Sequence, residues 1–365
     1  MDGDASPAQI AAYCMSAWAS GTMFWRWWRL DGEGRRQVWW LYGWFSGLML
    51  CGSCFGAVAW GTDMQVFVLN FSTYNNPSST LTNAQILSYA AQIRRWLASF
   101  SVTYAMEFFC LSVAKLTVLD RMTDFAAFKA DGMLRRWVVG RRFVMTAVVA
   151  GNVMGLGGNV AAAVYFERTA EFYSAASAAY TANNTADGNS FVNLGRQQAQ
   201  LAASIQALQS FCEVAVLLLI IVTFAVVGAA CARRVSSALL ATTDAASAAA
   251  GRKLRLHIVG TAAFVFVTFL LRAVYSIMFA LAFELQNGAN AASCPSQNPC
   301  DAPCFNVYKL MQLWLIYTPE LQLTVVLISS PLALLVALWG MTSERTLQLM
   351  QSNRREMNAM RGSML

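Results

Sequence analysis

Three ionisable side chains stand deep inside long apolar stretches of this 365-residue sequence: Glu107, Arg272 and Glu320. Each lies about ten residues, or about 15 Å along a helix, from one end of its stretch, and the three ends are predicted to face the same side. Because an ionised group in apolar surroundings is costly unless it is paired, we predict that Arg272 pairs with Glu320, Glu107 or both. Such a cluster either fixes the packing of helices or lines a site for a ligand or an ion.

A fourth charge, Lys115, lies about one turn from the opposite end of its apolar stretch. A lysine in that position can extend its ammonium group to the lipid headgroups, so we predict a structural role for it.

The stretches that carry these charges are typical of a membrane protein. Hydrophobic residues make up 57% of the sequence and charged residues 12%, whereas soluble domains carry about 25% charge. The net charge of +7 comes from short basic clusters between apolar stretches, a pattern of membrane topology rather than of nucleic-acid binding. We therefore predict one all-α, multi-pass helical bundle over residues 1–365 that binds no nucleic acid.

Six stretches are long enough to cross the roughly 30 Å hydrocarbon core. They are residues 38–60, 97–119, 143–166, 211–232, 257–283 and 311–340. A weaker seventh stretch, residues 9–28, gives seven spans if it crosses the membrane and six if it lies in the membrane interface; we favour seven. Small-residue pairs, Gly52 with Gly56 and Gly151 with Gly155, predict close helix contacts within the bundle.

The basic residues predict the orientation. Nineteen Lys and Arg residues fall on one side of these spans and five on the other, which makes the richer side cytosolic and puts the amphipathic tail 341–365 there. The opposite side carries the glycosylation sequons of Asn70 and Asn183, and three cysteines that are candidates for a disulfide: Cys294, Cys300 and Cys304. An odd count leaves one of them free or paired elsewhere, for example with Cys212. These features indicate a eukaryotic secretory-pathway membrane, with the plasma membrane favoured.

With seven spans, the third ends in Leu119-Asp120-Arg121-Met122. This resembles the acidic-Arg pair that closes the third helix of rhodopsin-like G-protein-coupled receptors, with Met122 where Tyr is usual. The resemblance implies that Arg121 is a cytosolic switch and Asp120 its partner, although the N-P-x-x-Y signature of that family is absent. A third switch candidate is Ser236, which follows Arg233-Arg234-Val235 as in a substrate of a basophilic kinase.

No catalytic motif for an intramembrane enzyme stands in the spans, and we expect no enzyme activity, cofactor or metal. Our leading hypothesis is a receptor-like seven-helix sensor of an external small molecule, with a cytosolic signalling partner. The alternatives are an ion or solute channel or transporter, and a non-catalytic membrane scaffold.

Overall fold

The computed structural model describes residues 5–29, 40–74, 81–127, 134–240, 256, 259–260, 263–264, 266–278, 281 and 310. The regular secondary structure of these residues is helical throughout, as expected for an all-α protein. The helices are α1 (Ala5–Trp28), α3 (Trp40–Tyr74), α4 (Asn83–Ala127), α5 (Leu134–Thr181), α6 (Thr185–Leu240) and a shorter apolar helix, Phe266–Met278.

Four of the described helices are long and apolar enough to span a membrane. These spans are Tyr42–Thr73, Asn83–Thr117, Arg142–Thr181 and Thr185–Ala230, and they contain the predicted spans that begin at residues 38, 97, 143 and 211 apart from a few residues at the ends. The chain is thus compatible with a membrane protein. The count of seven is not confirmed: residues 9–28 form α1, which is not among the four, and residues 311–340 and the tail 341–365 lie outside the described residues.

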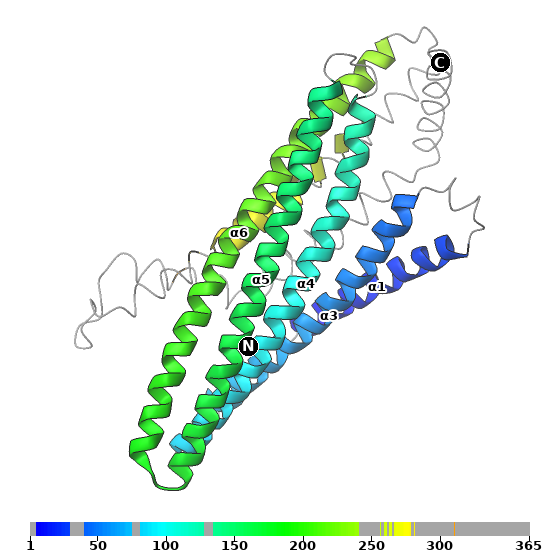
Figure 1. Cartoon of the computed structure of the whole chain (residues 1–365). Helices are drawn as coiled ribbons and strands as arrows, with labels where there is room; N and C mark the ends of the chain where they lie inside the picture. Colours follow the sequence, from blue (N-terminus) through cyan, green and yellow to red (C-terminus); the bar gives the residue numbers. More distant parts are fainter. Residues whose placement is uncertain are drawn as a thin grey trace.

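The long helices α4, α5 and α6 lie side by side and form most of the bundle (Figure 1). At 56 residues, α6 is about 84 Å long, far more than a bilayer core requires. The segment 167–181, which continues beyond the predicted span 143–166, is part of α5, and alanines of this segment are buried in the bundle. Ala170 and Ala176 of α5, like Ala202 of α6, are fully buried.

A tight turn joins α5 to α6. Asn183 has a positive φ of 59°, a conformation that Asn tolerates better than most residues. The side chain of Asn184 accepts a hydrogen bond from the backbone N–H of Asp187 at 3.3 Å, which caps the start of α6.

Helix α1 runs antiparallel along α3 over most of its length. Near one end of α1, Tyr13 lies against Gly56, and near the other end Trp27 lies against Gly43. Between them the Ser53 hydroxyl donates a 2.9 Å hydrogen bond to the Ser16 hydroxyl oxygen, both side chains being buried. This lengthwise contact makes α1 cross the bundle beside α3, with its chain running in the opposite direction.

The predicted small-residue contacts are confirmed as contacts within the bundle. A Cβ atom added at Gly52 would stand 3.0 Å from Leu111 of α4, and one added at Gly151 would stand 2.5 Å from Val216 of α6. These glycines let the helix backbones approach closely. The apolar core on which they border is formed by α3, α4, α5, α6 and Phe269 of the helix Phe266–Met278.

Candidate functional site

A charged cluster lies in the interior of the bundle, where α4, α6 and the helix Phe266–Met278 meet. Arg272 Nη2 lies 3.6 Å from Glu213 Oε1, and the two side chains are only 3% and 4% exposed. Tyr104 of α4 joins them: its hydroxyl donates to Glu213 Oε1 at 3.0 Å and accepts a hydrogen bond from Arg272 Nη2. Burial excludes bulk water from this ion pair, so its Coulomb interaction is screened far less than that of a surface pair.

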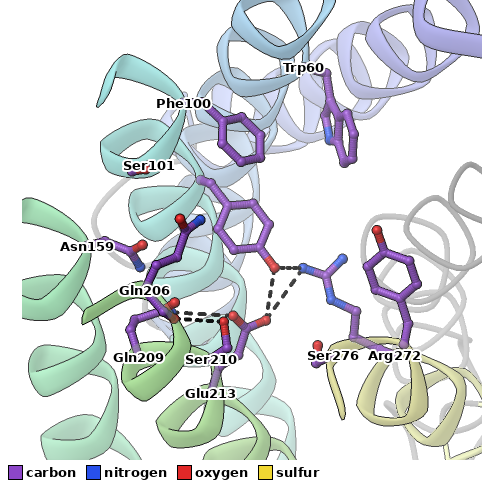
Figure 2. A pocket seen from close by; sticks show the side chains of 12 residues that line it. Trp60, Phe100, Ser101, Asn159, Gln206, Gln209, Ser210, Glu213, Arg272 and Ser276 are labelled. Atoms are coloured by element: carbon purple, nitrogen blue, oxygen red, sulfur yellow. Dashed lines mark hydrogen bonds and ion pairs between the residues drawn. The ribbon is translucent and has the colours of Figure 1, made fainter. Parts of the chain in front are cut away.

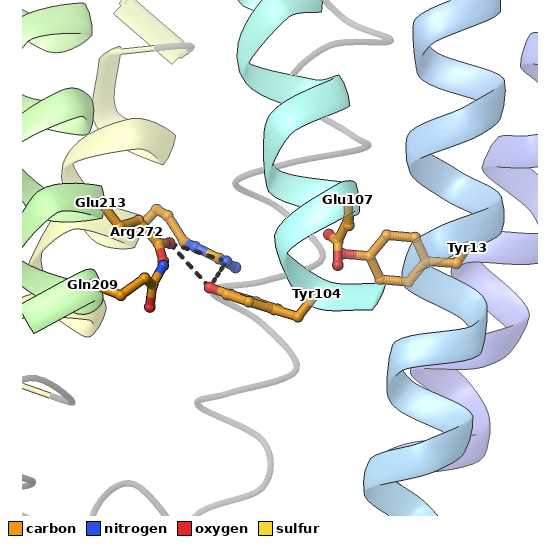
Figure 3. A network of polar contacts seen from close by, with 6 residues as sticks. All are labelled: Tyr13, Tyr104, Glu107, Gln209, Glu213 and Arg272. Atoms are coloured by element: carbon orange, nitrogen blue, oxygen red, sulfur yellow. Dashed lines mark hydrogen bonds and ion pairs between the residues drawn. The ribbon is translucent and has the colours of Figure 1, made fainter. Parts of the chain in front are cut away.

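A second buried carboxylate, Glu107, lies about one turn along α4 from Tyr104. Glu107 Oε1 accepts a hydrogen bond from the Tyr13 hydroxyl of α1, whereas the buried Glu107 Oε2 has no hydrogen-bond partner among the residues that the structure describes. In Figure 3, Tyr104 points toward Arg272 and Glu213, and Glu107 points toward Tyr13. Tyr104 thus links α4 to α6, and Glu107, about one turn along the same helix, links it to α1.

These contacts give Arg272 a partner that the sequence did not suggest. Among the described residues Arg272 pairs with Glu213 and forms no ion pair with Glu107, whereas Glu320 lies outside the described residues, so its pairing with Arg272 stays a prediction. The sequence does not single out Glu213, because this residue stands two residues inside the stretch that begins at Phe211, where a charge is expected near the membrane surface. In the structure the preceding polar residues Gln206, Gln209 and Ser210 face the bundle interior, so the end of the apolar run is not the end of the buried segment.

A cavity of about 60 Å³ adjoins the charged cluster (Figure 2). One wall is aromatic: Trp60 and Phe100 meet edge to face at 6.3 Å, and Phe100 stacks on Tyr104 at 5.6 Å. The opposite wall carries amides and hydroxyls. The full lining consists of Trp60, Phe100, Ser101, Tyr104, Asn159, Gln206, Gln209, Ser210, Glu213, Arg272, Tyr275 and Ser276.

Two of the lining side chains have unused hydrogen-bond donors. Arg272 is 2% exposed, and its Nε and Nη1 atoms are buried without a hydrogen-bond partner among the described residues. Trp60 Nε1 is likewise buried without a hydrogen bond of normal geometry to a described residue, and the Tyr13 side chain is its neighbour. Since buried polar groups are nearly always hydrogen-bonded in folded proteins, these donors mark the cavity as a place for an acceptor.

The predicted extension of the Lys115 ammonium group to the lipid headgroups is wrong, whereas the structural role of this residue stays a prediction. This side chain is 1% exposed, and its Nζ lies 4.5 Å from the centre of the Phe269 ring, a cation–π contact in the bundle core. It does not extend to a helix end because α4 continues to Ala127, and because the helix Phe266–Met278 packs over it.

The predicted switch residues lie near the C-terminal ends of long helices, and each of these helices continues beyond them. Asp120 is 9% exposed on α4, which continues for seven residues beyond it, and Arg121 follows it on the same helix. Ser236 is in the last turns of α6. The structure does not describe the side chains of Arg121 and Ser236.

The predicted modification sites differ in their surroundings. Asn70 is half-buried within α3, whereas Asn183 is exposed in the turn between α5 and α6, the kind of position that glycosylation requires.

Cys212 is free, and so are the other cysteines whose side chains the structure describes, Cys14, Cys51, Cys54 and Cys110. The candidate disulfide cysteines Cys294, Cys300 and Cys304 lie outside the described residues.

Replacing Tyr13 by Phe tests the contact between α1 and α4. The change removes the donor to Glu107 Oε1 and leaves this buried carboxylate without its hydrogen bond, so we expect the free energy of unfolding to fall by about 1–2 kcal/mol. Denaturant titration in mixed micelles measures this. The control is Tyr180→Phe, which removes an exposed hydrogen bond to Asn189 and should have a smaller effect than Tyr13→Phe. Equal effects would contradict a special role for the buried contact.

Within the part of the chain that the structure describes, no group of three or more His, Cys, Asp or Glu side chains is placed to hold a metal ion. No model of a known protein family matches the chain, and comparisons with curated proteins and with solved structures give no match.

Proposed function

We propose that this chain is a multi-pass membrane protein that binds a small polar solute in the cavity beside Arg272 and Glu213, and that it acts as a receptor-like sensor of that solute. The observation that carries the proposal is the cavity itself: it adjoins a buried ion pair, and Arg272 has N–H donors there that no described residue accepts. Ionisable residues within membrane helices mark functional sites by default. A binding role rather than a catalytic one is part of this proposal.

The cavity limits the size of the solute. One water needs about 10–15 Å³ by the same measure, so about 60 Å³ holds about four waters or a solute of about four non-hydrogen atoms. Pockets for drug-sized ligands have about 300–1,000 Å³. The proposed external ligand is therefore small.

The packing of α1 supports seven spans over six. A helix in the membrane interface lies in the plane of the membrane surface, roughly perpendicular to the spanning helices. Helix α1 instead lies along α3, from Tyr13 to Trp27. If α3 crosses the bilayer, α1 crosses beside it in the opposite direction. The proposed topology has an outer N-terminus and a cytosolic C-terminus, in a plasma membrane of the eukaryotic secretory pathway, with a cytosolic signalling partner.

An N-terminal epitope tests this topology. We expect an antibody against an epitope fused before Met1 to label intact cells that express the full chain. A cytosolic epitope at the C-terminus is the control, and it should be labelled only after permeabilisation. Labelling of the N-terminal epitope only after permeabilisation, with surface expression verified, would mean that α1 does not cross.

A transporter is the second candidate, and one observation favours it. Glu107 and Lys115 are both buried on α4, together with the Tyr104 hydroxyl that contacts Arg272, and the three positions extend over about 16 Å of the helix. Such a series of polar groups is found along ion and proton paths. A scaffold, the third candidate, needs these groups for folding alone.

Binding and flux separate the three candidates. The full chain in proteoliposomes would be offered labelled solutes of up to about five non-hydrogen atoms, representing anions, cations and neutral amides. The sensor proposal expects saturable binding of at least one of them without net movement across the membrane. Flux above that of empty liposomes would favour the transporter, and the absence of any binding would leave the scaffold.

A further inference from the structure

We propose that the solute of this cavity is a small planar oxyanion, a short-chain carboxylate of about four non-hydrogen atoms in size, bound by Arg272 and Trp60. This inference rests on the proposed function and names the class of solute that the same site takes. It follows from three features of the cavity: the kind of hydrogen-bonding groups left unused, the state of the nearby carboxylate, and the shape of the walls.

The unused groups are all donors. Among the described side chains that line the cavity, the buried polar atoms without a hydrogen-bond partner are Arg272 Nε, Arg272 Nη1 and Trp60 Nε1. Each of them is an N–H group that cannot accept a hydrogen bond. A ligand that satisfies them must present acceptor oxygens, and a carboxylate presents two oxygens with about four acceptor positions.

The carboxylate of the cavity is already engaged. Glu213 Oε1 accepts from the Tyr104 hydroxyl and lies 3.6 Å from Arg272 Nη2, and Glu213 Oε2 lies 3.5 Å from the Gln209 amide nitrogen. A cationic solute would have to displace these contacts and would be repelled by the Arg272 guanidinium group. An anion meets the guanidinium group at atoms that Glu213 does not use (Figure 2).

The walls fit a carboxylate with a short apolar end. Trp60, Phe100 and Tyr104 form a continuous aromatic surface beside the donors, on which a methyl group packs without losing hydrogen bonds. The volume of about 60 Å³ excludes long chains. Acetate meets both conditions, because it combines two acceptor oxygens with one methyl group.

The test is isothermal titration of the full-length protein in lipid nanodiscs with probes of matched size. The anions are formate, acetate, bicarbonate and nitrate, and the controls are neutral acetamide and cationic methylammonium. We expect saturable binding of at least one anion and at least tenfold weaker binding of both controls. Butyrate, which exceeds the cavity, should bind more weakly than acetate.

Two variants connect binding to the named donors. Trp60→Phe removes the Nε1 donor and keeps the aromatic wall, so the dissociation constant of the bound anion should rise about threefold to tenfold. Trp96→Phe, at a partly exposed tryptophan of α4 outside the cavity, is the matched control and should bind as the wild type does. Arg272→Lys keeps the positive charge but removes the fixed set of donors, and we expect it to abolish measurable binding while thermal unfolding shows that it still folds.

The outcomes separate the two proposals. If acetamide or methylammonium binds as tightly as the best anion, the oxyanion class is wrong and the proposed solute-binding function stands. If anions bind but Trp60→Phe and Arg272→Lys leave their affinity unchanged, the site is elsewhere and this inference fails. If no probe of any charge binds, the proposed function fails with it.

Discussion

Replacement of Arg272 by Leu is expected to lower the free energy of unfolding by about 3–5 kcal/mol, because it leaves the carboxylate of Glu213 buried without its counter-charge. The double variant Arg272→Leu with Glu213→Leu should recover much of this loss, since it removes both charges from the interior. Denaturant titration of the four proteins of this cycle in mixed micelles gives the coupling energy. A double variant no more stable than Arg272→Leu alone would contradict the ion pair as the source of the effect.

The chain contains a matched control for this cycle. Arg95 Nε and Glu167 Oε1 are also 3.6 Å apart, but their side chains are 54% and 49% exposed. Exposed pairs contribute about 0–1 kcal/mol, because solvent screens the charges and the side chains lose conformational freedom. The cycle of Arg95→Leu with Glu167→Leu should therefore give a coupling energy several-fold smaller than that of Arg272 with Glu213.

A second large effect is expected at Gly151. Replacing it by Leu should lower the free energy of unfolding by about 3 kcal/mol, because even the first added carbon would stand 2.5 Å from Val216, and α5 and α6 would have to separate. Val216 cannot move aside easily, since it is 5% exposed within the apolar core. Thermal unfolding of the purified protein in detergent measures the change.

Gly157 provides the comparison for Gly151. It is exposed on the same helix, and a carbon added there meets no atom within 4 Å. Gly157→Leu should leave stability unchanged or raise it by up to about 1 kcal/mol, since Leu favours the helix more than Gly does. Equal losses at the two positions would mean that the backbone of α5, rather than its contact with α6, sets the effect.

The helices of the fold could be predicted from the sequence to a large extent. Apolar runs near residues 38–60, 97–119, 143–166 and 211–232 fall within α3 to α6, and the paired glycines do form close helix contacts. The ends of the helices could not be predicted in this way. Residues 167–181 are small and weakly polar, and only their packing against a neighbouring helix distinguishes this stretch from a loop.

The candidate site was predicted in part. The sequence singled out Glu107 and Arg272 because charge in an apolar run is conspicuous, but it missed Glu213, Tyr13 and Trp60. A tyrosine or a tryptophan in a membrane helix carries no signal of this kind. Glu213 stood close to polar residues, and no periodicity in the sequence distinguishes polar residues that face a cavity from polar residues that face water.

The amino-acid sequence alone therefore indicates an α-helical chain with too few charges for a soluble surface and a small number of ionisable groups that need partners. Which partners these groups have depends on the packing of the helices. Hydropathy is a property of each segment alone. An ion pair such as Arg272 with Glu213, whose residues are 59 positions apart in the chain, depends on the depth and the rotation of the two helices that carry them. Those two quantities are fixed by helix-to-helix packing, at contacts such as Gly151 against Val216 and Gly56 against Tyr13.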